Sequence, residues 1–157
     1  MKIKIITVGR IKEKFYKSAI EEFSKRLSAY TKIEFIEVQD ERTYEDNESG
    51  NIKTRRIEAD RILTKIGDTD YVVVLDIYGM EYTSEEFAKK ISSIMMGNST
   101  ITFIIGGSVG LDERIKSLAH LKLSFSKFTF PHNLMKLILM EQIYRAFKIL
   151  KNEPYHK

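Results

Sequence analysis

Two short runs of mostly β-branched and other apolar residues limit the possible folds most strongly. Tyr71–Ile77 and Thr100–Ile105 have the length of strands and are apolar almost throughout. A strand with one face in water alternates polar and apolar residues, whereas a strand covered on both faces does not. A sheet covered on both faces needs a helical layer on each side. The two runs therefore predict an α/β fold.

Segments with helical periodicity separate the strand-like segments along the chain. The predicted strands are Lys2–Val8, Ile33–Val38, Tyr71–Ile77, Thr100–Ile105 and Leu121–Phe125. The predicted helices are Lys12–Leu27, Ile52–Ile66, Thr83–Met95, Leu111–Leu118 and a long last helix. Residues 40–50 are polar and acidic and include Gly50, which predicts a loop. The alternation predicts a single domain, residues 1–157, with a mostly parallel, doubly wound sheet.

The last helix, from Pro131 to Leu150, is apolar around most of its circumference. A surface helix of a monomer usually shows one apolar stripe. One apolar face can lie on the sheet, and the other needs a second partner, most simply the same helix of another protomer. A central helix within one chain is the alternative, although 157 residues leave little room for it. We therefore expect a homodimer.

The composition excludes several classes of protein. The chain has no cysteine, which excludes disulfides, thiolate nucleophiles and iron–sulfur clusters and suits a reducing cytosol. The apolar start, Lys2–Val8, is interrupted by Lys4 and is too short for a signal peptide or a membrane span. We expect a cytoplasmic protein with no membrane partner.

Positive charge gathers toward the two ends of the chain, and the net charge is +4. Residues 2–17 and 127–157 are rich in lysine and arginine, whereas residues 34–48 are acidic. If the fold joins the two ends, they would form a basic face suited to a polyanion such as RNA. Ordinary solvated helix faces are the simpler explanation of the same charges.

Three segments place polar or glycine residues where predicted strands end. They are Leu75–Gly79, Ile104–Leu111 and Leu123–His132. In open α/β sheets, ligands bind at the carboxyl ends of the strands. The glycine segment, Gly106–Gly110, matches neither the dinucleotide-binding pattern nor a P-loop. It is either a plain turn or a turn that lets a ligand approach the backbone. The Ser/Phe alternation of residues 124–130 indicates either a purine-binding loop or an aromatic plug in the core.

These segments, taken together with both ends of the chain, resemble a known family. The resemblance rests on Val8-Gly9-Arg10-Ile11-Lys12, Ile105-Gly106-Gly107, Phe128-Thr129-Phe130-Pro131-His132, Glu141-Gln142-Ile143-Tyr144-Arg145-Ala146 and Tyr155-His156. In this order they resemble the large-subunit ribosomal RNA methyltransferase H family of the SPOUT superfamily, whose members methylate N3 of a pseudouridine in 23S ribosomal RNA. The resemblance runs from end to end and is weakest around residues 43–51.

The resemblance implies a C-terminal trefoil knot, a homodimer and S-adenosyl-L-methionine as the cofactor. It assigns the cofactor to Leu75, Gly106, Phe125, Ser126, Lys127, Phe128, Thr129 and Phe130. It assigns substrate and catalytic roles to Arg145, Tyr155 and His156, with His132 nearby. The implied partner is large-subunit ribosomal RNA or the whole ribosome.

The residues at the end of the chain suit this chemistry. Methyl transfer from a sulfonium needs no metal, and its main requirement is that the acceptor nitrogen be positioned against the methyl group. The acceptor must lose a proton, so His156 is a candidate base and Arg145 a candidate stabiliser of the anion. Tyr155 either stacks on a base or anchors the tail by its ring. His120 has no such context and is interpreted as structural.

Two other functions are compatible with parts of the sequence. A nicotinamide- or flavin-binding enzyme fits the fold, but the phosphate-binding fingerprint is absent. A non-catalytic ribosome- or RNA-binding module fits the basic ends. It gives no reason for the glycine turn, the Ser/Phe loop and the Arg/Tyr/His ending to occur together.

Overall fold

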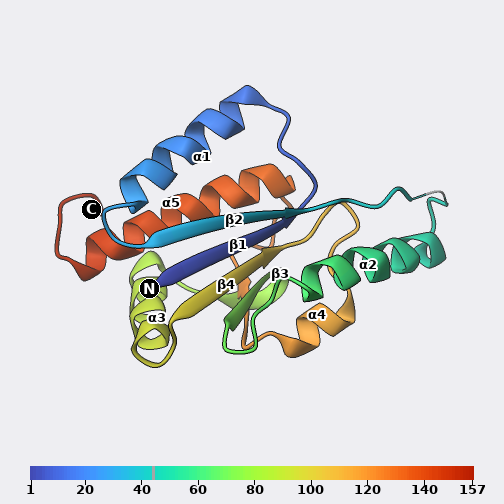
Figure 1. The fold of residues 1–157 in the computed structure, drawn as a ribbon. Coiled ribbons are helices and arrows are strands. Elements are labelled where there is room, and N and C mark those ends of the chain that lie inside the picture. Colours follow the sequence, from blue (N-terminus) through green and yellow to red (C-terminus); the bar gives the residue numbers. More distant parts are fainter. Residues whose placement is uncertain (44) are drawn as a thin grey trace.

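The computed structural model describes residues 1–43 and 45–157, and its centre is a five-stranded sheet (Figure 1). The strands are β1 (Lys2–Val8), β2 (Lys32–Val38), β3 (Tyr71–Glu81), β4 (Thr100–Ile105) and β5 (Leu121–Ser124). Their order is β2-β1-β4-β3-β5, and all four neighbouring pairs are parallel. The predicted α/β class and parallel sheet are confirmed.

Helices cover both faces of the sheet. They are α1 (Lys14–Leu27), α2 (Glu48–Leu63), α3 (Ser84–Gly97), α4 (Glu113–Leu118) and α5 (His132–Leu150). Alternate strand residues face opposite layers, as the pleat requires. Ile3, Ile5 and Phe103 belong to the core shared with α1, α3 and α5. Ile6, Val8 and Ile104 belong to the core shared with α2 and α4. The sheet is therefore covered on both sides, which explains the nearly continuous apolar runs of β3 and β4.

Two element boundaries differ from the predictions by four residues, and others differ by one to three. Helix α2 begins at Glu48, because Asn47 caps it by accepting a hydrogen bond from the Gly50 backbone N–H at 2.8 Å. The predicted loop therefore ends before Gly50, and its Tyr44 lies outside the described residues. Strand β3 continues to Glu81 beyond the predicted turn at Ile77, with a register shift between Leu75 and Met80.

Helix α5 lies between two other helices of the same chain. It packs against α1 and α3 as well as the sheet (Figure 1). This packing covers much of its apolar circumference and brings the basic N-terminal helix beside the basic C-terminal one. Leu134, Leu137 and Ile138 are half-buried and do not belong to the main core. They are spaced three and four residues apart and so form one stripe along α5.

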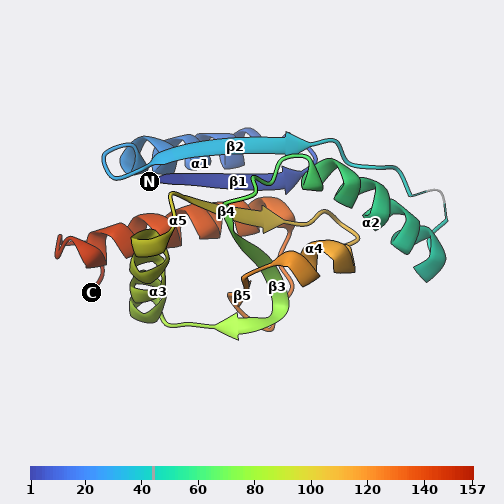
Figure 2. The ribbon, with the colours of Figure 1, turned by 60° about the horizontal axis from the view of Figure 1, so that its bottom comes forward.

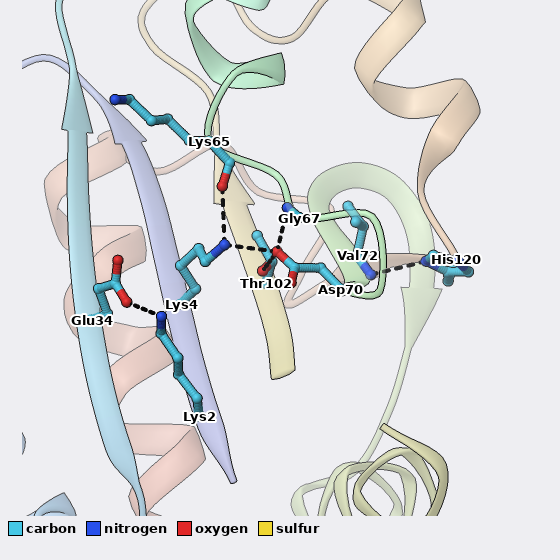
Figure 3. Close-up of polar contacts among 9 residues, drawn as sticks. All are labelled: Lys2, Lys4, Glu34, Lys65, Gly67, Asp70, Val72, Thr102 and His120. Carbon is cyan, nitrogen blue, oxygen red and sulfur yellow. Dashed lines mark hydrogen bonds and ion pairs between the residues drawn. The ribbon is translucent and has the colours of Figure 1, made fainter. Parts of the chain in front are cut away.

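A buried polar cluster joins three of the strands near their amino ends (Figure 3). Lys4 Nζ donates to Asp70 Oδ2 at 2.8 Å and to the Lys65 carbonyl at 3.0 Å. The Thr102 hydroxyl donates to the same Asp70 oxygen at 2.7 Å. Nearby, His120 Nδ1 accepts from the Val72 backbone N–H at 2.9 Å, which fits its structural interpretation. These bonds satisfy polar groups that burial would otherwise leave unpaired.

The course of α5 sets the geometry of everything that follows. It starts at the carboxyl edge of the sheet and runs back, so that the C-terminus lies at the same end of the molecule as the N-terminus in both views (Figures 1 and 2). The trefoil knot stays a prediction, because strand order and pairing do not describe how the segment after β5 threads. No helix in residues 1–43 or 45–157 has the length and apolar character needed to cross a bilayer.

Candidate active site

A pocket of about 490 Å³ lies where β3, β4 and β5 end at the carboxyl edge of the sheet. Its walls come from the end of β3, the glycine turn after β4 and the loop after β5, together with the start of α5. This volume is within the range of pockets that hold small molecules, about 300–1,000 Å³. The three segments that the sequence singles out therefore meet around one cavity.

The glycine turn forms the floor of the pocket by close backbone packing. A Cβ atom on Gly106 would lie 3.0 Å from both the Gly110 carbonyl carbon and Leu111 Cγ. The Gly110 N–H donates to the Gly107 carbonyl at 3.1 Å, which closes the turn. Positive φ occurs at Gly110, at 81°, and not at Gly106. A glycine is thus required at position 106 because Gly110 and Leu111 pack closely against it. At position 110 a glycine is required because the backbone has a positive φ.

Two serine hydroxyls shape the loop after β5. Ser124 Oγ lies 3.1 Å from the Ile77 carbonyl and 3.0 Å from the Ser126 carbonyl, and so ties the loop to β3. Ser126 Oγ accepts from the Phe128 backbone N–H at 3.1 Å. Phe128 remains largely exposed at the rim, with 78% of its surface accessible. The Ser/Phe alternation therefore reflects a loop that lines the pocket rather than a plug in the core.

The residues that the resemblance assigns to the cofactor lie around this pocket, with one exception. Leu75, Gly106, Phe125, Ser126, Phe128, Thr129 and Phe130 all line it. Lys127 is exposed and instead lines a second, more open hollow with Glu81. His132, at the first position of α5, also lines the pocket.

Two charged lining residues were not predicted from the sequence. Asp76 lies in β3, directly after Leu75, and Lys116 lies in α4. Their charged atoms, Asp76 Oδ2 and Lys116 Nζ, are 3.9 Å apart. Asp76 belongs to a segment that the sequence singles out, so an acid at a strand end was an available signal. Lys116 carries no signal, since a lysine on a short helix is ordinarily solvated.

Arg145, Tyr155 and His156 meet in a second group, at the other end of α5. We call this group the tail cluster, and its members are Glu85, Glu141, Arg145, Tyr155 and His156. Glu141 Oε1 accepts from Arg145 Nη2 at 2.5 Å and from the Tyr155 hydroxyl at 3.0 Å. The Arg145 guanidinium also lies 4.7 Å from the centre of the Tyr155 ring. The tail cluster thus anchors the last residues of the chain.

The hydrogen bonds of His156 fix its tautomer. Arg145 Nη1 lies 3.1 Å from His156 Nδ1, and a guanidinium can only donate. Nδ1 therefore accepts, and Nε2 carries the hydrogen that it donates to Glu85 Oε1 at 2.7 Å. The Nδ1 lone pair is occupied by Arg145 in this arrangement. A base at this position becomes available only when Arg145 moves away.

The surroundings shift several pKa values in the tail cluster. The hydrogen bond to Glu141 raises the pKa of Arg145, which keeps the guanidinium charged. Burial, followed by the hydrogen bond to Glu141, raises the pKa of Tyr155, so its hydroxyl stays protonated. The hydrogen bond from His156 lowers the pKa of Glu85. The tail cluster therefore presents a fixed cation, a neutral phenol and an oriented imidazole.

Within one chain the pocket and the tail cluster are far apart. His132 lines the pocket, and Arg145 lies 13 residues further along α5. At 1.5 Å per residue, this spacing corresponds to about 20 Å. The candidate catalytic residues are thus divided: His132 lies at the pocket, and Arg145, Tyr155 and His156 lie together at the opposite end of the helix.

Comparison with known proteins identifies the family of this chain. The family model described as "Predicted SPOUT methyltransferase" matches residues 1–156. Proteins named ribosomal RNA large subunit methyltransferase H are similar along the full length of both chains. Those of Streptococcus suis, Streptococcus uberis and Clostridium perfringens are 54%, 55% and 51% identical to this chain, with 100% of each chain covered. The chain therefore belongs to the SPOUT methyltransferase family.

Proposed function

We propose that this protein transfers a methyl group from S-adenosyl-L-methionine to N3 of a pseudouridine in 23S ribosomal RNA, in the cytoplasm and on assembled ribosomes. The observation that carries the proposal is the pocket at the carboxyl edge. All but one of the residues that the resemblance assigns to the cofactor line it. Relatives at 51–55% identity carry the name ribosomal RNA large subunit methyltransferase H.

The residues of the pocket fit the methyl donor. Aromatic and aliphatic side chains suit an uncharged adenine, and the glycine turn brings backbone to the pocket wall, where the Cβ position of Gly110 has no atom within 4 Å. When bound, the donor supplies a methyl group on a positively charged sulfur. Gly106, Phe125 and Thr129 would hold its adenosyl part by contact and backbone hydrogen bonds, which orients the methyl group toward the mouth of the pocket.

The protein is proposed to act as a homodimer, because one chain holds its own two groups too far apart. Reacting atoms must approach to about 3–3.5 Å, whereas pocket and tail cluster are separated by about 20 Å along α5. Two α5 helices that pack antiparallel about a two-fold axis place the start of one opposite the end of the other. The partner's tail cluster would then face the pocket.

The half-buried stripe on α5 suits that interface. Leu134, Leu137 and Ile138 lie outside the main core and lead along the helix toward Glu141 and Arg145. Burying an apolar stripe between two copies contributes about 25 cal/mol for each Å² removed from water, part of which offsets the entropy lost on association. The rest of the apolar circumference of α5 is covered by α1 and α3.

In the proposed reaction the tail cluster removes the proton from N3. Arg145 moves from His156 Nδ1 to an oxygen of the pseudouridine, which frees the Nδ1 lone pair. Nδ1 then accepts the N3 proton, and Glu85 stabilises the resulting imidazolium through the Nε2–H bond. Arg145 stabilises the negative charge that develops on the ring. When bound, the donor would supply the methyl group that N3 accepts after it has lost its proton.

The proposal is tested by incubating the protein and S-adenosyl-L-methionine with assembled ribosomes, with isolated large subunits and with naked ribosomal RNA. The RNA is then digested to nucleosides, which are separated and identified by mass spectrometry. The expected result is N3-methylpseudouridine, most abundant with assembled ribosomes. Absence of any new methylated nucleoside in all three substrates, from protein that binds the donor, would contradict the proposal.

A further inference from the structure

Two opposite charges face the pocket from different elements. Asp76 and Lys116 supply the only carboxylate and the only ammonium group among the described residues that line it. The remaining lining groups are apolar, aromatic, hydroxyl or backbone groups, together with the ring of His132. A ligand group that carries charge in this pocket therefore has few places where its charge can be balanced.

Neither charged group is fully paired. Asp76 Oδ1 accepts from the Tyr78 backbone N–H at 3.1 Å, while its Oδ2 lies 3.9 Å from Lys116 Nζ. The second carboxylate near Lys116 is that of Glu113, also at 3.9 Å. These are ion-pair distances and are longer than hydrogen bonds. An ammonium group has three donors and a carboxylate has about four acceptor positions, so both retain capacity for a ligand.

Because Asp76 and Lys116 are partly buried, hydrogen-bonding positions that stay without a partner destabilise the empty pocket. The side chain of Asp76 is 10% exposed, and that of Lys116 is 25% exposed. Glu113, by contrast, is 85% exposed and does not line the pocket. Charged groups withdrawn from water favour a partner of opposite charge. Asp76 and Lys116 are therefore arranged to receive a ligand that carries both signs.

The methyl donor has one part that matches this pair. Its adenosine is uncharged, whereas its amino-acid end carries an ammonium and a carboxylate on the same carbon. We propose that Lys116 binds the donor's carboxylate and Asp76 binds its ammonium group, so that the pair selects donors with an intact amino-acid end. The inference rests on the proposed function and adds two specificity-determining residues to it.

Binding of truncated ligands tests the two contacts separately. Calorimetry is performed with S-adenosyl-L-methionine, its decarboxylated form, S-adenosylhomocysteine and methylthioadenosine. The decarboxylated form lacks the carboxylate but keeps the amine, and methylthioadenosine lacks both. Lys116→Met keeps the aliphatic stem, and Asp76→Asn keeps the oxygen that accepts from Tyr78. Glu113→Gln is the matched control, because it removes the exposed neighbour of Lys116.

Each variant has its own expected pattern. Lys116→Met should raise the Kd for S-adenosyl-L-methionine about 10- to 100-fold and leave the decarboxylated form within about threefold. Asp76→Asn should weaken both of these ligands by a similar factor. S-adenosylhomocysteine should follow S-adenosyl-L-methionine, which excludes the sulfonium as the group that Asp76 recognises. The Kd for methylthioadenosine should be unchanged in both variants. The Glu113→Gln protein should bind all four ligands with the wild-type Kd.

Three results would overturn the inference while the proposed function stands. In the first, a variant binds methylthioadenosine and the full donor with equally weakened affinity. In the second, neither variant changes the Kd for the full donor. In the third, the Lys116→Met protein no longer binds the decarboxylated donor. A wild-type protein that binds none of the four ligands would instead contradict the proposed function itself. Thermal unfolding of each variant establishes that it is folded. If the Asp76→Asn protein does not fold, the binding of the full and the decarboxylated donor to the Lys116→Met protein is a sufficient test.

Discussion

The pocket and the tail cluster consist of different kinds of chemical groups. The pocket is made mainly of backbone, glycine and apolar side chains at the ends of buried strands. The tail cluster is made of five polar side chains that satisfy one another through hydrogen bonds. A pocket of this kind exists before its ligand arrives. The tail cluster, by contrast, must exchange an internal bond for a substrate contact before it can act.

This difference assigns the two regions separate tasks. Changes in the pocket should alter affinity for the donor, whereas changes in the tail cluster should alter methyl transfer without altering that affinity. Helix α5 joins the two regions and sets the distance between them, since it begins at the pocket and ends at the tail cluster. The proposed site then needs two chains.

The largest expected effect is that of removing the tail. Deletion of Pro154–Lys157 removes Tyr155 and His156 but leaves the sheet and the pocket intact. Methylation of ribosomes should fall by about 100-fold or more, the range of a lost general base. The Kd for the donor should stay within about threefold. Lys151→Ala, an exposed change beside the tail, is the control. Wild-type methylation by the truncated protein would refute the role of the tail.

A charge in the α5 stripe should give the next largest effect. Leu137→Asp places a carboxylate in the proposed dimer interface, where an unpaired buried charge costs several kcal/mol. At micromolar protein, methylation should fall about 10- to 100-fold, and ultracentrifugation should show monomers. Met96→Asp, on an exposed apolar residue of α3, should leave both unchanged. An active monomeric Leu137→Asp protein would separate activity from association and contradict the shared site.

Blocking the glycine turn should weaken donor binding by about tenfold. Gly106→Val adds atoms where a Cβ already lies 3.0 Å from Gly110 and Leu111, so the turn must shift by a cost on the order of 1–3 kcal/mol. Calorimetry with the donor measures the change. Gly97→Ala is the control, because nothing lies within 4 Å of its added Cβ. Unchanged affinity in a folded Gly106→Val protein would leave the turn with a purely structural role.

The smallest effect should come from the exposed partner of His156. Glu85→Gln weakens the Nε2–H bond and should lower the methylation rate about threefold, the scale of an exposed ion pair. The pKa of Glu85 is lowered in the folded protein. Its contribution to stability is therefore fully present above about pH 4.5, the ordinary pKa of a glutamate, and is lost as pH falls through the lower folded pKa. Acid titration of the unfolding free energy should be slightly flatter in Glu85→Gln.

Much of the fold was predictable because burial leaves a clear pattern in the sequence. β1 and β4 have the predicted bounds, since both are covered on two faces and bounded by polar residues or glycine. The start of α2 was wrong because the Asn47 cap overrides a polar, glycine-containing segment. The extension of β3 was missed because its second half pairs with β5 after a register shift, which no local pattern indicates.

The site was predictable only in its local parts. Glycines and serines at strand ends marked the pocket, because their spacing is set by turns in the chain. Lys116 was missed because its role depends on which strand α4 packs against. The separation of His132 from Arg145 follows from their spacing on the predicted helix, whereas the approach of Glu85 to His156 depends on how α3 packs against α5. The packing of α5 against α1 and α3 was left open by its uniform apolar character, which allowed a central helix as the alternative to a second protomer.

Mixed dimers test most directly the claim that one site is formed by two chains. At a donor concentration below the wild-type Kd, a Gly106→Val homodimer should methylate at about a tenth of the wild-type rate, because it binds the donor about tenfold more weakly. A homodimer without Pro154–Lys157 lacks the tail and should be nearly inactive. If the site is shared, each mixed dimer holds one pocket and one tail that face each other. Equal mixing with exchange of subunits should then restore about a quarter of wild-type methylation, since about half of the dimers are mixed and each has one intact site of two. Mixed dimers that form but recover no activity would show that each chain uses its own tail and would contradict the account.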